Sequence, residues 1–180
     1  PIIKTITSKT DFALKYQHPY TKHILNNTAK ISADSINASL LFPFAYQQTN
    51  AVKLCLSYPI SIMTGGPGSG KTTTLRFILD IYQAAFPSNE ILLAAPTGRA
   101  SRRMSEQTGK YASTLHSALG LVTEEDSPLN DTEMLSADLI VVDEFSMVDM
   151  RLAYVLLERI KPGAQLIIVG AVSYTHLRAH

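Results

Sequence analysis

A glycine-rich segment at residues 65–72, Gly-Gly-Pro-Gly-Ser-Gly-Lys-Thr, constrains the fold of this chain more than any other feature. It matches the pattern G-x-x-x-x-G-K-[ST], and it lies between an apolar run that ends at Thr64 and a helical run that follows. Glycines let such a loop turn its backbone N–H groups inward around phosphate oxygens, because they tolerate positive φ and carry no Cβ. The segment predicts a phosphate-binding P-loop between a strand and a helix; the alternative is a glycine-rich surface turn.

The loop also predicts how a nucleotide and its metal are held. Loop amides and the following helix N-terminus bind phosphate, Lys71 adds a mobile positive charge, and the Thr72 hydroxyl is a ligand for Mg²⁺. The predicted nucleotide-binding residues of the loop are Gly66, Pro67, Gly68, Ser69, Gly70, Lys71, Thr72 and Thr73.

From residue 44 onward, short apolar runs alternate with longer helical patterns. This alternation predicts an α/β fold, a P-loop NTPase with a parallel sheet and helices on both faces. The predicted strands are Pro59–Thr64, Ile91–Ala95, Asp138–Val142 and Gln165–Val169. The predicted helices are Tyr46–Leu56, Lys71–Ala85, Gly98–Thr108 and Met150–Ile160, with a further amphipathic pattern over Asp11–Ile24.

Two acids, Asp143 and Glu144, follow the third of these strands directly. They are therefore expected at the carboxyl edge of the sheet, where open α/β folds bind ligands. Mg²⁺ bound to phosphates needs a nearby carboxylate, which is the role we expect for Asp143. Neighbouring side chains diverge as a strand ends, so we expect Glu144 to orient or activate the attacking water. With Lys71 these two acids form the predicted catalytic set.

Composition limits the ligands that this chain can bind and the cellular compartment in which we expect it. The chain carries 16 Lys and Arg against 15 Asp and Glu, so any affinity for a polyanion must come from local patches. Its single cysteine, Cys55, cannot form an internal disulfide, and we see neither a leader peptide nor a membrane span. These observations favour the cytoplasm. The chain begins with Pro1 instead of Met, and we expect it to be a fragment.

Three further segments carry a family resemblance, at residues 94–104, 112–116 and 142–149. They contain Ala-Pro-Thr-Gly-Arg-Ala, Ser-Thr-Leu-His and Val-Asp-Glu-Phe-Ser-Met, in that order. Together with the P-loop they resemble the RecD family of superfamily-one DNA helicases over about residues 40–170. The family usually has a small residue where this chain has Phe145.

The resemblance implies further roles. Gln48 stands where the family reads adenine, which favours ATP, although an exposed helix-start glutamine is the plainer interpretation. The segment with Thr97, Gly98 and Arg99 resembles the element that grips single-stranded DNA, and Thr114 and His116 resemble a second DNA-contacting element. Arg102, Arg103 and Lys110 extend this positive strip, or form a solvated basic face. A lone histidine such as His116 is as often structural.

The same resemblance implies the organisation of the protein. We expect residues 1–43 to be a short, helical N-terminal extension, 44–170 an incomplete RecA-like ATP-binding lobe, and 171–180 a non-native tail. The family steps 5′ to 3′ along single-stranded DNA in repair and recombination, some members within a helicase–nuclease complex, exodeoxyribonuclease V. The fragment should bind ATP without unwinding DNA, because the second lobe with its arginine is missing.

Two other classes of function stay open. A GTP switch or small-molecule kinase shares the P-loop, but a guanine-binding protein needs an Asn-Lys-x-Asp-like element after that loop. The near match, Ser8-Lys9-Thr10-Asp11, precedes it. The other alternative is a module that binds nucleotide or single-stranded DNA and never turns over.

Overall fold

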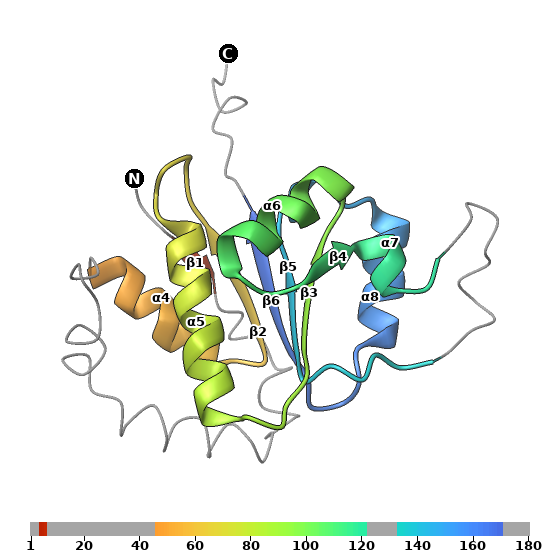
Figure 1. The fold of residues 1–180 in the computed structure, drawn as a ribbon, viewed down its shortest axis with the longest axis horizontal. Coiled ribbons are helices and arrows are strands. Elements are labelled where there is room, and N and C mark those ends of the chain that lie inside the picture. The colour runs from red at the N-terminus through yellow and green to blue at the C-terminus, as the bar shows by residue number, and fades with distance from the viewer. Residues whose placement is uncertain (1–3, 7–45, 122–132, 171–180) are drawn as a thin grey trace.

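A mixed six-stranded sheet forms the centre of the molecule in the computed structural model, which describes residues 4–6, 46–121 and 133–170 (Figure 1). The strands are β1 (Lys4–Ile6), β2 (Ile60–Thr64), β3 (Ile91–Ala95), β4 (Ala112–Thr114), β5 (Leu139–Val142) and β6 (Gln165–Gly170). Their order across the sheet is β1-β2-β6-β5-β3-β4. The strands from β2 to β4 in this order are all parallel, and β1 pairs antiparallel with β2 at one edge.

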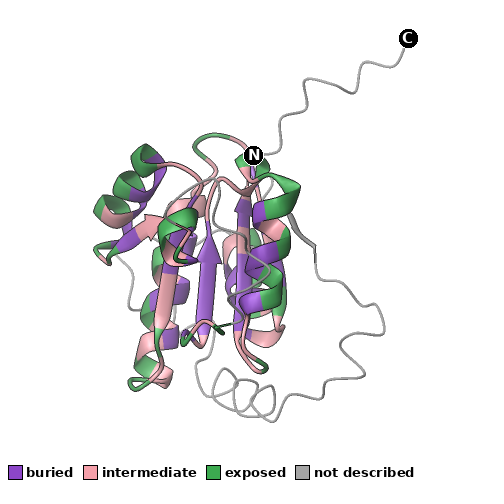
Figure 2. Cartoon of the chain, turned by 90° about the vertical axis from the view of Figure 1, so that its right-hand side faces the viewer, coloured by how far each residue is buried: buried purple, intermediate pink, exposed green. Residues whose placement is uncertain are grey.

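Helices cover both faces of this sheet, as its parallel strands require. They are α4 (Tyr46–Ser57), α5 (Lys71–Ala85), α6 (Gly98–Thr108), α7 (Leu115–Ala118) and α8 (Met150–Arg159), with a 3₁₀ turn η1 (Phe145–Met147). α4, α5 and α6 pack on one face through a cluster that includes Val52, Ile78 and Met104. α7 and α8 pack on the other face through Leu115 and Leu156. The buried strands separate these two layers, and the exposed residues lie mainly on the outer helix surfaces (Figure 2).

Local sequence explains where the helices begin and end. The side chains of Thr97, Thr114 and Asp149 cap α6, α7 and α8, each by accepting a hydrogen bond from the backbone amide of the third residue of its helix. Gly109 ends α6 in the left-handed conformation that glycine adopts without strain. The Thr97 cap starts α6 three residues after the end of β3.

The structure confirms the predicted α/β fold and its parallel core. The bounds predicted for α5, β3 and α6 are confirmed, and the other predicted elements differ by one residue at an end. Three short elements after residue 45 were not predicted, namely β4, α7 and the 3₁₀ turn η1. In the predicted helical extension, Lys4–Ile6 is instead an edge strand, since it pairs with β2. The pattern over Asp11–Ile24 and the tail 171–180 lie outside the described residues.

Candidate nucleotide site at the carboxyl edge of the sheet

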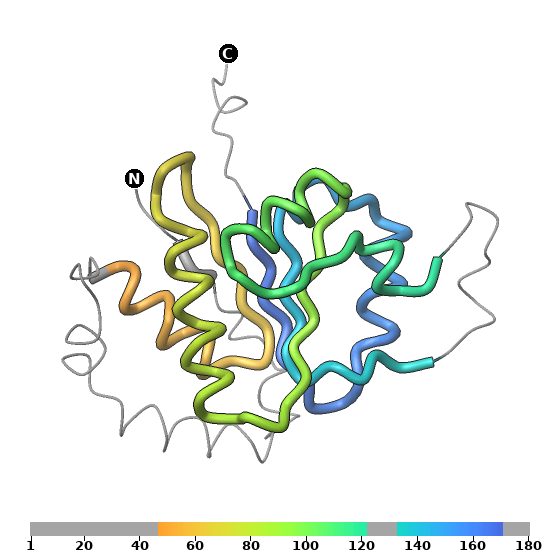
Figure 3. The backbone as a smooth tube through the Cα atoms, in the orientation of Figure 1, coloured from red at the N-terminus to blue at the C-terminus, as the bar shows by residue number. Residues whose placement is uncertain are grey.

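The predicted site segments meet at one edge of the sheet. The P-loop follows β2, Asp143 follows β5, Thr97 lies two residues after β3, and Thr114 ends β4. Because these strands are parallel, all four positions lie at their carboxyl ends, at the top of the fold in Figure 1. The yellow P-loop stands at this upper edge in the backbone trace (Figure 3).

The backbone of the P-loop has the geometry that its glycines predict. Gly68 and Gly70 have φ of 70° and 80°, in the left-handed region. The amide of Ser69 donates to the Gly66 carbonyl at 3.3 Å, which closes a tight turn. The Lys71 ammonium folds back over the loop and donates to the carbonyls of Gly65 at 2.6 Å and Gly66 at 2.9 Å. The lysine is therefore held over the loop by neutral acceptors that a phosphate could replace.

Gln48 lies against the same loop. A Cβ built on Gly70 would collide with the Gln48 Nε2. Glycine is therefore required at this position for two reasons, the positive φ and the close approach of the Gln48 amide. The structure thus brings the Gln48 side chain, which the resemblance assigns to adenine, into contact with the phosphate loop. Sequence patterns alone do not predict this contact between α4 and the loop before α5.

The loop residues fit a phosphate group. The Ser69 hydroxyl is buried and has no hydrogen-bond partner among the described residues. It approaches Gly65 so closely that a Cβ there would lie 2.6 Å from the Ser69 Oγ. A buried hydroxyl without a partner is costly, so a bound anion in the loop would relieve it. Behind the loop, α5 presents its N-terminus to the same place.

The acid pair begins a sharp turn at the end of β5. The Asp143 amide donates to the Ala94 carbonyl, which extends the pairing with β3, and the Asp143 Oδ1 accepts from the Glu144 amide at 2.8 Å. Glu144 has φ 52° and is the one non-glycine residue with positive φ in residues 4–6, 46–121 and 133–170. Such strain is characteristic of functional sites. The chain changes direction at Glu144 and does not continue as an extended strand, in which successive side chains would alternate between the two faces of the sheet.

The site elements keep a defined spacing. β6 lies between β2 and β5, so the strands that carry the P-loop and Asp143 are about 10 Å apart. Thr72 lies in the first turn of α5, half-buried, next to the exposed Thr73. In the part of the chain that is described, no three His, Cys, Asp or Glu side chains gather as a metal-binding group. A cation here would need phosphate oxygens among its ligands, as Mg²⁺ ordinarily does.

The predicted DNA-contacting residues lie at or just after the carboxyl ends of β3 and β4, the two strands farthest from the P-loop. Ala95 pairs with Thr114, which brings their two segments together. The oxygens of Thr97 and Thr114 accept capping bonds from Ala100 and Ser117, which orients both hydroxyls and leaves their hydrogens as donors. Gly98, Arg99 and His116 are exposed. The edge therefore offers N–H, O–H and guanidinium donors to solvent.

Sequence reasoning did not predict the role of Arg159. This arginine is 8% exposed, donates to the Leu119 carbonyl and has its own carbonyl bonded to the Leu135 amide. It thereby ties the end of α7 to α8. The only signal in the sequence is a basic residue in the last turn of a helix, which is common and indicates no contact.

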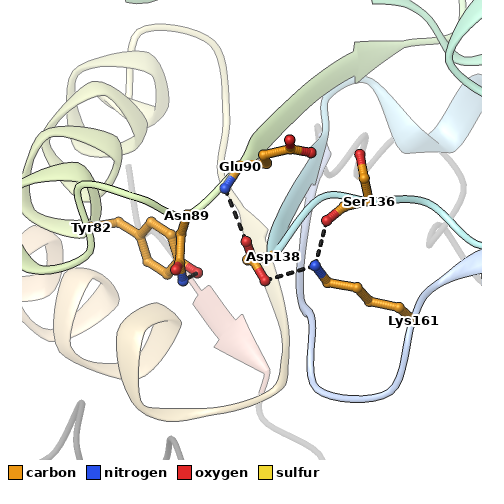
Figure 4. Close-up of polar contacts among 6 residues, drawn as sticks. All are labelled: Tyr82, Asn89, Glu90, Ser136, Asp138 and Lys161. Atoms are coloured by element: carbon orange, nitrogen blue, oxygen red, sulfur yellow. Dashed lines mark hydrogen bonds and ion pairs between the residues drawn. The ribbon is translucent and has the colours of Figure 1, made fainter.

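At the opposite edge of the sheet, Asp138 joins three segments (Figure 4). Its carboxylate contacts the Lys161 ammonium at 2.8 Å and accepts from the Glu90 amide at 2.9 Å. Partial burial opposes ionisation of Asp138, but the hydrogen bonds from Lys161 and Glu90 and the charge of Lys161 outweigh it and lower the pKa of this carboxyl. Asp138 precedes β5 and lies away from the candidate site.

The fold and the loop define this chain as a P-loop NTPase. It belongs to the AAA domain family AAA_19, whose sequence model matches residues 48–174. The chain is 38% identical over 158 residues to the RecBCD enzyme subunit RecD of Mycolicibacterium smegmatis, covering 74% of this chain and 28% of that protein. It is 37% identical to the ATP-dependent RecD2 DNA helicase of Deinococcus radiodurans, covering 69% of this chain and 17% of that protein.

Solved structures agree with this assignment. The Pif1 helicase of Candida albicans superposes with a TM-score of 0.54 at 25% identity, covering 71% of this chain and 32% of that one. The UvsW helicase of bacteriophage T4 shares the fold, with a TM-score of 0.59 at 10% identity, over 78% of this chain and 59% of that one. The resemblance to the RecD family is confirmed, and the chain spans less than a third of the RecD and RecD2 relatives. Within the described ranges no helix has the length and apolarity needed to cross a bilayer.

Proposed function

We propose that this chain is the ATP-binding and ATP-hydrolysing lobe of a DNA helicase that moves on single-stranded DNA during repair and recombination. The observation that carries the proposal is the shared edge of the sheet, where the P-loop, the acid pair and the two threonine-capped segments lie on parallel strands. A motor needs this proximity because nucleotide state must act on DNA contacts. The similarity to RecD and RecD2 proteins supports the same assignment.

Different residues of the site would have different roles toward the bound nucleotide. MgATP would supply the triphosphate and a divalent cation. Lys71 would leave the Gly65 and Gly66 carbonyls and neutralise phosphate charge, while the Ser69 hydroxyl gains an acceptor. Thr72 and Asp143 are the proposed Mg²⁺ ligands, and Glu144 the residue that orients the attacking water and takes its proton.

Gln48 adds a preference for adenine in this proposal. Its amide lies against Gly70, so a base bound beside it would sit next to the phosphate loop. A primary amide donates and accepts at once, which matches the amino group and ring nitrogen on one edge of adenine. Guanine presents a different pattern there, so ATP should bind more tightly than GTP.

The DNA would bind along the neighbouring strands. Thr97 and Thr114 would donate hydroxyl hydrogens to phosphates, Gly98 its amide, and Arg99 and His116 charged or polar contacts. These contacts carry no base selectivity, as a translocating protein requires.

We further propose 5′ to 3′ movement, a cytoplasmic setting, and a parent protein that works alone or with helicase–nuclease subunits. The chain itself would bind ATP without unwinding, because an arginine from a second lobe completes hydrolysis.

Phosphate release by the intact parent protein tests the motor assignment. DNA-stimulated ATP hydrolysis is the expected result, and its absence would favour the alternative of a module that binds but never turns over. Tighter binding of GTP than of ATP to this chain would instead favour a different P-loop class.

Single-stranded DNA binding tests the second surface separately. Fluorescence anisotropy of a labelled oligonucleotide should show that Arg99→Ala weakens binding and lowers the slope of log affinity against log salt by about 1. Arg76→Ala is the matched control, since Arg76 is also exposed but lies on α5. Equal effects of the two substitutions would contradict the proposed DNA surface.

A further inference from the structure

The outer face of α8 carries an apolar strip that the fold leaves uncovered. Seven large apolar side chains are exposed in the described part of the chain, and four of them lie within residues 147–157. They are Met147 at 60% exposure, Met150 at 87%, Tyr154 at 54% and Leu157 at 54%. Isolated exposed apolar residues need no explanation, but such a concentration on α8 and the turn η1 before it marks an interaction surface.

The spacing of this strip places it opposite the core. At 3.6 residues per turn, Met150, Tyr154 and Leu157 fall within roughly 60° of one another on the helix. The buried residues Leu152, Val155, Leu156 and Arg159 occupy the other side. α8 is therefore apolar on both sides, which is typical of a helix covered by protein on both sides.

The charges beside the strip identify what can cover it. Arg151 and Glu158 are both exposed and lie seven residues apart, so they share one flank of the helix. Neither takes part in the salt bridge recorded within the described ranges, which joins Lys161 to Asp138. Opposite charges at equivalent heptad positions are complementary to themselves only when a second copy of the helix runs antiparallel, because the same flank then faces itself.

We propose that the outer face of α8 docks a second copy of this chain, in an antiparallel pair of α8 helices. The two-fold axis passes beside Tyr154, which lies within half a residue of the midpoint of each pair of positions. Each Arg151 then faces Glu158 of the second copy, and each Met150 faces Leu157, as an isologous interface requires. A pair of ten-residue helices covers less than the roughly 800 Å² per partner of a standard interface, so the dimer is weak.

Charge reversal tests this geometry in the 180-residue chain. In sedimentation equilibrium up to about 1 mM, we expect Arg151→Glu and Glu158→Arg to weaken self-association by roughly 3- to 30-fold each, because two symmetric pairs become repulsive. An equimolar mixture of the two variants should associate about as tightly as the original chain. The double variant should do the same, since it exchanges the charges without losing the pairing.

Several results would overturn the proposal. A chain that stays monomeric at 1 mM has no such interface, and a foreign protein or another segment of the parent then covers α8. Self-association that ignores both reversals, or a mixture no tighter than either variant alone, places the interface elsewhere. Circular dichroism verifies that each variant folds, which the exposure of both side chains favours.

Cross-linking gives an independent check of the axis. Tyr154→Cys should form a disulfide-linked dimer under mild oxidation, because the two substituted positions lie next to the axis. Tyr111→Cys is the matched control, since Tyr111 is 84% exposed but lies before β4, outside the strip. Equal cross-linking at both positions reflects random collision and contradicts the proposal. Neither measurement involves nucleotide or DNA, so their failure leaves the proposed function unaffected.

Discussion

The geometry of Gly70 combines backbone and side-chain requirements at a single residue. Its φ of 80° strains any residue with a Cβ, and the Gln48 amide occupies the place where that Cβ would lie. Gly68 has a similar φ of 70° but open space around its Cα. Both glycines thus have positive φ, but Gly70 alone has a side chain where its Cβ would lie, so the pair helps to separate backbone strain from the contact with Gln48.

Substitution of these glycines should show that difference. Gly68→Ala should lower the free energy of unfolding by about 1 kcal/mol through positive φ alone. Gly70→Ala should cost about 1 kcal/mol more, because Gln48 must also move. Urea denaturation measures both values. Adding Gln48→Ala to Gly70→Ala should remove the excess, and an unchanged excess would show that the contact with Gln48 has no energetic effect.

Gln48 itself should affect nucleotide choice. Gln48→Ala should weaken MgATP binding by roughly 5- to 50-fold, as expected for the loss of two hydrogen bonds, and should reduce the preference for ATP over GTP. Gln47→Ala is the control, since Gln47 is the exposed neighbour on the same helix. Competition with a fluorescent nucleotide gives the affinities, and equal effects of the two substitutions would remove Gln48 from the site.

Among the helices and strands, the long or well-buried elements were predicted from the sequence, and the short, less buried ones were not. α5 and α6 have long periodic patterns and β3 is a continuous apolar run, so local sequence sufficed for their bounds. β4 has three residues, of which only Ala112 is buried, and α7 has four residues. β4 forms because it pairs with β3, and α7 forms because Thr114 at the end of β4 caps it, so both depend on tertiary structure. The contact of Gln48 with Gly70 and the buried Arg159 were likewise beyond local patterns.

Asp138, which contacts Lys161 and the Glu90 amide at the amino edge of the sheet, predicts that the stability of the chain depends on pH. The pKa of Asp138 is lowered in the fold, so its contribution is present above its ordinary pKa and is lost as pH falls through the folded value. Asp138→Asn should therefore destabilise the chain at pH 7, by less than about 1 kcal/mol, and by a smaller amount near about pH 3. Urea denaturation at both pH values measures this. Asp80→Asn, on the exposed face of α5, should show neither effect.

For the whole molecule, Cys55 reports the integrity of the core beneath α4. Burial raises the pKa of this thiol to about 12 from 9.0, although the neighbouring Ser61 hydroxyl opposes the shift. The folded chain then keeps its proton while the unfolded chain loses it. Stability should fall as pH rises from about 9 toward 12, by up to about 1.4 kcal/mol per pH unit.

The comparison with Cys55→Ala isolates this thiol from other groups that titrate at alkaline pH. The variant should be less stable at pH 8 but should lose less stability between pH 8 and about pH 10. Denaturant midpoints at the two pH values provide the test. Parallel losses in both proteins would mean that the thiol ionises as easily in the fold as in the unfolded chain.

Calorimetric titration of MgATP into the chain and into Lys71→Ala tests the central claim, that the loop after β2 binds a nucleoside triphosphate. Lys71 already lies over the loop carbonyls, so its loss should weaken binding by roughly 10- to 150-fold, the effect of one charge-assisted contact. Lys53→Ala, at an exposed position on α4, should bind like the original chain. Equal affinity in all three proteins would contradict the assignment of this loop as the phosphate site.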